Sequence, residues 1–542
     1  MDRIIFCLVF LWIFGTSFPL SAQDRYAVHY KFKPQSSFSL DAPEAFLLPP
    51  ALDRRARENI PVDSTDLPVA SKYVEVISSL VEEISYHSKW LNASLVVASE
   101  DQLRELGQLP FVASVTLVAK GSGEAGRTGK LEYNENFFPG SDKAASYEFQ
   151  NGILGIPAMH KAGFTGAGVV VAVFDAGFQN TDKISGMQHL FENDQILATK
   201  NFVTPNTDEV FGSDPHGTAA LSLMASHKPG ALVGGAYGAK YILCITEDVA
   251  SEYRIEEYNW IRAAEFSDSL GVDIINSSLG YNYFDDPMMN YSPEDLDGKT
   301  AVISRGAALA AQKGILVVSS AGNEGNGSWQ TLTPPADADG ILSVGSVNNN
   351  LTRSGFSSIG PTKDGRIKPE LVAFGSGVTI WRQADKTNTS SGTSFTSPQI
   401  AALAAGLWEA RPDWTRATLI QNLLASGTLA DSPDSELGYG IPNFLDAYYG
   451  KLLETEPKKE WVQAFIYPNP LDGDLLKIDF GREKNCSFKM ISTQGRIVRE
   501  RLLSRNSRDV PYEASLANTV PGLYIIELSG NGGLERLRLI RK

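Results

Sequence analysis

The chain has 542 residues and carries 63 acidic against 48 basic side chains, for a formal net charge of −15. This length exceeds one compact domain and predicts roughly two to four. The acidic balance argues against binding that depends on neutralising phosphates, so we expect no nucleic-acid partner.

Residues 1–22 have the pattern of a signal peptide. Arg3 precedes an apolar run at 4–14, and small residues follow at Ser21 and Ala22, where cleavage is expected. That run is too short to cross a bilayer comfortably, and no later apolar run reaches the necessary length. We therefore expect no transmembrane segment in the mature protein.

The cysteines do not form a disulfide framework. Cys7 lies in the removed segment, while Cys244 and Cys486 lie far apart in the chain. Cys244 sits within an apolar run, which favours a small core residue over a reactive thiol.

Residues 23–145 combine a small folded region with a linker. Strand-like and amphipathic patterns alternate at 26–32, 73–86, 95–97 and 112–118. This order is typical of a small α+β unit. The stretch 120–130, rich in Gly, Ser and Lys, predicts an exposed linker with basic cleavage points at Lys120, Arg127 and Lys130.

Residues 146–452 alternate apolar strands with longer helices. The expected strands are 169–174, 241–246, 272–276, 315–319 and 341–347. The expected helices are 218–226, 255–270 and 302–313, the last two ended by Gly271 and Gly314. This alternation predicts an α/β fold with a parallel sheet covered by helices on both faces. Chemistry in such folds belongs at the carboxyl ends of the strands.

The final block, residues 461–542, has a different pattern. Short strand-like runs are separated by turns at Asp472-Gly473 and Gln494-Gly495. This pattern predicts a small β-sandwich.

Two polar residues stand at the boundaries of predicted elements in the α/β region. Asp175 ends the strand at 169–174, although aspartate also simply terminates strands. His216 opens the next predicted helix, where a polar residue is ordinary in the absence of other signals. Neither residue identifies a site alone.

Two further groups are more informative. Ser394 stands among small residues just before an apolar helix whose first turn accommodates Pro398. A helix N-terminus stabilises the negative charge of a tetrahedral intermediate, although a serine there can also be only a cap. Asn323 follows the strand at 315–319, where it is either an oxyanion donor or a turn residue.

All four groups fall at strand ends or helix starts of one region, in the order Asp, His, Ser. α/β-Hydrolases instead run Ser, acid, His and carry Gly-x-Ser-x-Gly, which residues 392–396 do not spell.

This region resembles the subtilase family of serine peptidases. The motifs in family order are Val171–Gly177, His216–Thr218 and Gly392–Ser394, and similar intervening blocks occur at 235–240, 275–280 and 438–443. Ala176 replaces the more common Ser or Thr, and Phe395-Thr396-Ser397 replaces the usual Met-Ala-Ala. Neither change removes a functional group, but both leave specificity open.

The resemblance implies a subtilisin-like fold and a serine endopeptidase with the triad Asp175, His216 and Ser394. It implies Asn323 as the side-chain donor to the oxyanion, with the backbone N–H of Ser394 beside it. Ser278, Leu279 and Gly280 would pair with an extended substrate, and Ala321 and Gly322 would form a wall of its first specificity pocket. The substrates would be proteins or peptides. No cofactor is required for this chemistry; calcium is common in the family, but no compact ligand run names a metal site.

The flanking regions carry two more resemblances. Ser88–Ala93 and Leu109–Val112 are similar to subtilase propeptides, which template folding and block the cleft; the alternative is a permanently retained domain. The motifs 467–470, 491–496, 521–526 and 536–542 resemble the C-terminal sorting domain of type IX secretion; the alternative is a plain accessory domain. Together with the signal peptide, they imply export to the periplasm and then across the outer membrane, to the cell surface or the medium.

Two other functions remain open from the sequence. One is a surface-anchored subtilase scaffold that binds without turnover. The other is a maturation protease of narrow specificity, because the acidic insertion at 281–297 could restrict access to the cleft.

Overall fold

The structure is a computed structural model. It describes residues 24–34, 38–121, 147–204, 207–382, 384–450, 464–480, 485–493, 495–505, 511–530 and 533–542. The expected signal peptide, residues 122–130 of the expected linker and the turn residue Gln494 lie outside these ranges. The chain forms two compact units, divided between Leu452 and Leu453.

A seven-stranded parallel sheet forms the centre of the first unit, in the order β13-β12-β11-β10-β5-β9-β6. Its strands are β5 (Val170–Asp175), β6 (Ile196–Asn201), β9 (Lys240–Ile245), β10 (Ile274–Ser277), β11 (Leu316–Ser320), β12 (Leu342–Val347) and β13 (Leu371–Phe374). Short pairs flank it: β7 (His227–Lys228) with β8 (Leu232–Val233), and β14 (Val378–Trp381) with β15 (Thr387–Ser390). The parallel sheet is as predicted, but β6 and β13 were not.

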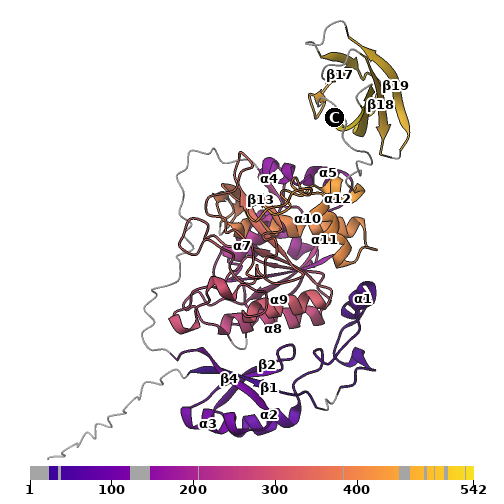
Figure 1. Ribbon diagram of the computed structural model, residues 1–542. Helices are drawn as coiled ribbons and strands as arrows, with labels where there is room; N and C mark the ends of the chain where they lie inside the picture. The colour runs from indigo at the N-terminus through magenta and orange to yellow at the C-terminus, as the bar shows by residue number, and fades with distance from the viewer. Residues whose placement is uncertain are drawn as a thin grey trace, which may run out of the picture. The chain divides into compact units, whose positions relative to one another are not determined.

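Helices cover both faces of this sheet (Figure 1). The principal ones are α7 (His216–Ala225), α8 (Ile255–Ser269), α9 (Val302–Gln312) and α10 (Ser397–Ala410). The others are α4 (Tyr147–Ile153), α5 (Ile156–Lys161), α6 (Gln188–Glu192), α11 (Arg416–Ala425) and α12 (Phe444–Tyr449).

Alternation along β5 divides the interior into two cores. Val171 and Val173 pack into the core that contains α7 and α10 residues, while Ala172 and Phe174 pack into the core of α8 and α9. Successive side chains of a strand point to opposite faces, so a strand buried on both faces must be apolar throughout.

The predicted helix ends are confirmed. Gly271 and Gly314 follow α8 and α9 with φ of 83° and 85°, in the left-handed region that glycine adopts without strain.

The N-terminal region, residues 24–121, contains a four-stranded antiparallel sheet in the order β2-β3-β1-β4. Its elements are β1 (Arg25–Tyr30), α1 (Pro49–Glu58), α2 (Ser71–Ser78), β2 (Glu83–Ser88), β3 (Ala93–Val97), α3 (Glu100–Gln108) and β4 (Val112–Ala119). The predicted α+β character is confirmed. The amphipathic stretch 73–86 divides between α2 and β2, and α1 and α3 were not predicted.

Two antiparallel sheets form the second compact unit and share one apolar core. One sheet contains β16 (Phe465–Tyr467), β17 (Leu475–Asp479) and β20 (Tyr512–Ser515). The other contains β18 (Asn485–Ser492), β19 (Ile497–Ser504), β21 (Gly522–Gly530) and β22 (Gly533–Arg541). The predicted β-sandwich is confirmed. Within the described ranges, no helix has the length and apolarity needed to cross a membrane.

We expect Leu243→Ala to lower the free energy of unfolding by about 2–5 kcal/mol, because the side chain is fully buried on β9 and its loss leaves a cavity. Leu197→Ala on the adjacent strand β6 is the matched control, since that side chain is 43% exposed. Chemical denaturation of both variants measures the difference. Equal losses would contradict the packing described for β9.

Candidate active site

Asp175 and His216 form a buried hydrogen-bonded pair at the carboxyl edge of the central sheet. Asp175 is the last residue of β5 and is fully buried, and His216 is the first residue of α7. The Nδ1 atom of His216 lies 2.7 Å from Oδ1 of Asp175, which also accepts the backbone N–H of Ala176 at 2.8 Å. These contacts fix the orientation of the imidazole and direct its Nε2 away from the carboxylate.

The pair has perturbed proton affinities. Burial alone would lower the pKa of His216, but the charge and hydrogen bond of Asp175 raise it to about 9, with smaller contributions from Asp214 and Glu247. Burial raises the pKa of Asp175, an effect that His216 opposes. The ionised carboxylate therefore stabilises the imidazolium, which is what a base needs once it has accepted a proton.

Ser394 lies on a short 3-10 turn, Thr393–Phe395, immediately before α10. The side chain is 4% exposed, and its Oγ donates to the backbone carbonyl of Ser278 at 3.2 Å. The ring of Phe395 lies 6.0 Å from the His216 imidazole, centroid to centroid. The structure thus brings the segment that carries Ser394 to the Asp175–His216 pair, with Pro398 in the first turn of α10 as predicted.

Asn323 follows β11 and faces this segment. Its Oδ1 accepts from the backbone N–H of Thr393 at 2.8 Å and from the Thr393 hydroxyl at 3.0 Å. These contacts hold the carbonyl oxygen and so fix the orientation of the Asn323 amide. The orienting role of Thr393 was not predicted, because in the sequence it is only one of several small residues in its motif.

The five predicted substrate-binding residues follow two neighbouring strands. Ser278, Leu279 and Gly280 come after β10, and Ala321 and Gly322 come after β11. Parallel pairing brings both segments to the edge that carries Asp175.

Thr333 closes the space between these two segments. A Cβ atom at Gly280 would lie 2.2 Å from Thr333 Oγ1, and one at Gly322 would lie 2.7 Å from the same atom. Both glycines are therefore required by close packing. Sequence reasoning missed Thr333, which no motif marks and only the fold brings here.

One group of carboxylates in the described chain is close enough to share a cation. Glu247, Glu252 and Glu256 are buried, and one oxygen of each lies within 4.8 Å of the others. Carboxylate oxygens are the ligands that Ca²⁺ prefers. This group is compatible with the structural calcium expected from the family resemblance, for which the sequence named no ligands.

Cys244 is buried in the core of α8 and α9, and burial raises the pKa of its thiol. This environment confirms the prediction of an inert core residue.

Comparison with known families divides the chain into three. Residues 166–440 match the subtilase family, residues 25–130 match the peptidase S8 propeptide domain of Bacteroidota, and residues 465–542 match the secretion system C-terminal sorting domain. The first match covers half of the chain.

Individual relatives agree with the first match. Subtilisin NAT of Bacillus subtilis subsp. natto is 26% identical over 66% of this chain and 81% of its own length. Subtilisin of Bacillus pumilus is 28% identical over 51% of this chain and 90% of its own. Among solved structures, MycP1 from Mycobacterium smegmatis aligns with a TM-score of 0.44 at 21% identity, covering 57% of this chain and 86% of that one.

We expect the His216 imidazole to titrate near pH 9 and the Asp175→Asn change to move that titration downward, because burial then acts without the opposing carboxylate. NMR of the ring in a Ser394→Ala background measures both values. His227→Gln, which removes a different ring, is the control for assignment. An unchanged titration in Asp175→Asn would contradict the proposed electrostatic coupling.

Proposed function

Because this chain belongs to the subtilase family of serine peptidases, we propose that it is a secreted endopeptidase whose triad is Asp175, His216 and Ser394. The observation that carries the proposal is the buried Asp175–His216 hydrogen bond beside the turn that holds Ser394. The family match and the subtilisin relatives identify a serine-type endopeptidase. The contact between Asp175 and His216 and the position of Ser394 on the turn before α10 support this choice of residues.

Catalysis begins with transfer of the Ser394 proton to Nε2 of His216 as Oγ attacks the carbonyl carbon of the scissile bond. The Ser394 hydroxyl must first leave the Ser278 carbonyl, to which it donates in the resting structure. Asp175 holds the ring in the required tautomer and stabilises the imidazolium. The negative oxygen accepts hydrogen bonds from the Asn323 amide and the backbone N–H of Ser394.

The intermediate then collapses to an acyl-enzyme. His216 returns its proton to the leaving amine, the C–N bond breaks, and the ester between Ser394 and the acyl group remains. Water attacks this ester with His216 again as base, which releases the acid and restores the serine hydroxyl.

Substrate binding is assigned to the strand-end segments. The extended peptide would pair with the backbone of Ser278, Leu279 and Gly280 as an added strand. Ala321 and Gly322 would line the first specificity pocket, with Thr333 behind them. The close approach of Thr333 to both glycines supports this assignment.

The flanking regions determine when and where the peptidase acts. The sorting-domain match identifies a secreted or cell-surface protein. We propose four regions. Residues 1–22 are the signal peptide, residues 23–145 the propeptide with its linker, residues 146–452 the peptidase and residues 461–542 the sorting domain. The propeptide would be the enzyme's own inhibitor, and the type IX secretion machinery would recognise the sorting domain.

An ordered insertion also favours restricted specificity. The segment 281–297 directly follows Gly280, and its Tyr291 hydroxyl donates to the buried Glu257 carboxylate. A wall fixed in this way next to the peptide-binding segment would limit which substrates enter. If the wall restricts specificity, digestion of a mixed peptide library should give products that share a few cleavage motifs. Cleavage at many unrelated sequences would contradict a maturation protease of narrow specificity.

We expect a fluorophosphonate probe to label the processed protein once, at Ser394, because the neighbouring base activates that hydroxyl. Intact-mass measurement of wild type against Ser394→Ala checks the site, and Ser397→Ala, on the first turn of α10, is a neighbouring control that should still label. Absence of labelling in processed wild type would overturn the protease and favour a binding scaffold.

We expect Asn323→Ala to lower kcat by about 10²–10³ with little change in KM, since the donor acts on charge that develops in the transition state. Asn326→Ala is the matched control, an exposed asparagine of the same loop. Steady-state hydrolysis of a peptide chosen from the library checks both. A loss confined to KM would indicate that Asn323 binds substrate rather than the oxyanion.

A further inference from the structure

The N-terminal region reaches the peptidase through two separate surfaces. Its sheet faces α8 and α9 (Figure 1). At this surface Ser88 Oγ donates to Glu265 of α8 at 2.6 Å. The second surface belongs to residues 47–69, between β1 and α2, which we call the arm. The arm contains α1 and lies at the edge of the central sheet opposite Asp175. It contacts Gly271 and Gly314, which precede β10 and β11. The arm therefore lies at the amino ends of the strands, away from the active site.

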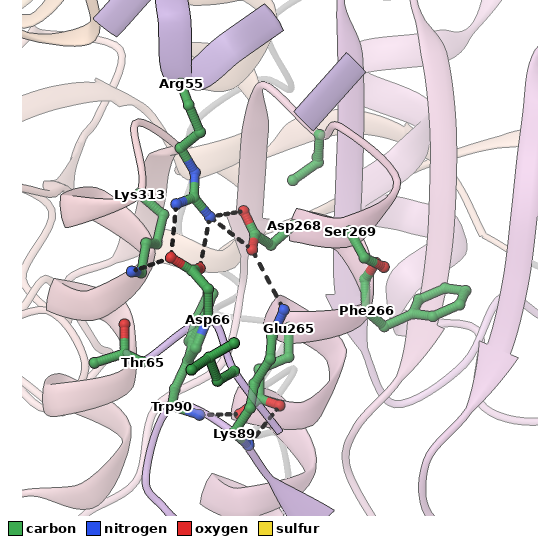
Figure 2. A network of polar contacts seen from close by, with 12 residues as sticks. Arg55, Thr65, Asp66, Lys89, Trp90, Glu265, Phe266, Asp268, Ser269 and Lys313 are labelled. Atoms are coloured by element: carbon green, nitrogen blue, oxygen red, sulfur yellow. Dashed lines mark hydrogen bonds and ion pairs between the residues drawn. The ribbon is translucent and has the colours of Figure 1, made fainter. Parts of the chain in front are cut away.

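Buried charges join the arm to the peptidase (Figure 2). Arg54 pairs with Asp268, the penultimate residue of α8, and the two side chains are 1% and 0% exposed. Arg55 pairs with the same Asp268 and with Asp66 of the arm, both at 3.0 Å. Asp268 thus receives two arginines from a region of the chain that the proposed processing would remove.

Lys313 extends the network from the peptidase side. Its Nζ lies 3.0 Å from Asp63 and 3.0 Å from Asp66, and its side chain is 2% exposed. Although burial alone would raise the pKa of Asp66, the hydrogen bond and charge of Arg55 help lower it to about 2, so this carboxylate is ionised at neutral pH. The charges alternate in sign across the interface, which is what makes their burial tolerable.

Further contacts between the arm and the peptidase lie at the edge of this buried network. Arg57 pairs with Asp273 at 3.0 Å and lies 4.6 Å from the ring of Trp408, near the end of α10. Glu58 accepts the backbone N–H of Arg416 at 2.8 Å, at the first residue of α11. A Cβ atom at Gly271 would lie 2.3 Å from Pro50, so the peptidase surface is shaped to receive the arm.

We propose that the arm is an anchor, remote from the cleft, that keeps the N-terminal region bound after the chain is cut between residues 122 and 146. The other end of this region lies nearer the substrate-binding segments, because Lys120 pairs with Asp286 at 2.9 Å in the insertion that follows Gly280. Retention at the arm would keep that end in place and the enzyme latent. The latency rests on the proposed function, whereas the retention does not.

The test uses the full chain with Ser394→Ala and a recognition sequence for an unrelated protease placed within residues 122–146. After the cut, the two pieces should elute together from a size-exclusion column, and their dissociation is followed on dilution. Arg55→Gln should weaken their association by about 10²–10³-fold, because Asp268 is then left with an incomplete set of partners in a buried site.

A double-mutant cycle separates direct pairing from indirect damage. Asp268→Asn should weaken association similarly, and the double variant should lose less than the sum of the two single losses. Arg104→Gln is the matched control, because its pair with Asp101 is exposed and internal to the N-terminal region. It should not change the association.

Two results would overturn the anchor. One is wild-type pieces that separate as readily as Arg55→Gln pieces, and the other is fully additive losses in the cycle. If the uncut Arg55→Gln chain does not fold, Arg57→Ala replaces it, because the Arg57 side chain is partly exposed. This change should weaken the association of the two pieces by about tenfold. An unchanged association would contradict the proposal. Binding is measured without turnover, so failure to label Ser394 would overturn the protease and leave this result standing.

Discussion

A buried carboxylate needs fixed partners that balance its charge, and two such carboxylates lie at opposite edges of the central sheet. Asp175 at the carboxyl edge of the central sheet is balanced by His216 and the backbone N–H of Ala176. Its position requires α7 to begin at the histidine and β5 to end at the aspartate. This pairing places the fixed imidazole beside the turn that carries Ser394.

Asp268 presents the same electrostatic problem at the other edge, with a different solution. Its partners Arg54 and Arg55 belong to the N-terminal region. Both partners of the Asp175 pair lie in the peptidase, whereas the Asp268 pairs join two regions of the chain. The same physical requirement is thus met within the peptidase at one edge and between two regions at the other.

The elements that could be predicted from the sequence are those whose pattern lies within a short window of residues. β5, α8 and α9 were predicted because apolar runs and a following glycine are visible in a short window. β6 was missed because its residues are mostly half-buried and read as a mixed pattern, and β13 because it is only a few residues long. The arm was missed for another reason: no local pattern in the sequence separates buried arginines from solvated ones, and only the tertiary structure shows that Arg54 and Arg55 are buried.

The sequence by itself determined the chemistry-bearing residue types, their order, and the parallel sheet, because periodicity and motif spacing are properties of the chain. It also determined the three-part organisation that the family matches confirm. Tertiary structure alone decided that Thr393 orients Asn323 and that Thr333 packs against Gly280 and Gly322. It also decided that charges of residues 54–66 meet those of residues 268–313. These contacts join segments far apart in the chain, so no local pattern in the sequence predicts them. They form only when the folded sheet brings those segments together.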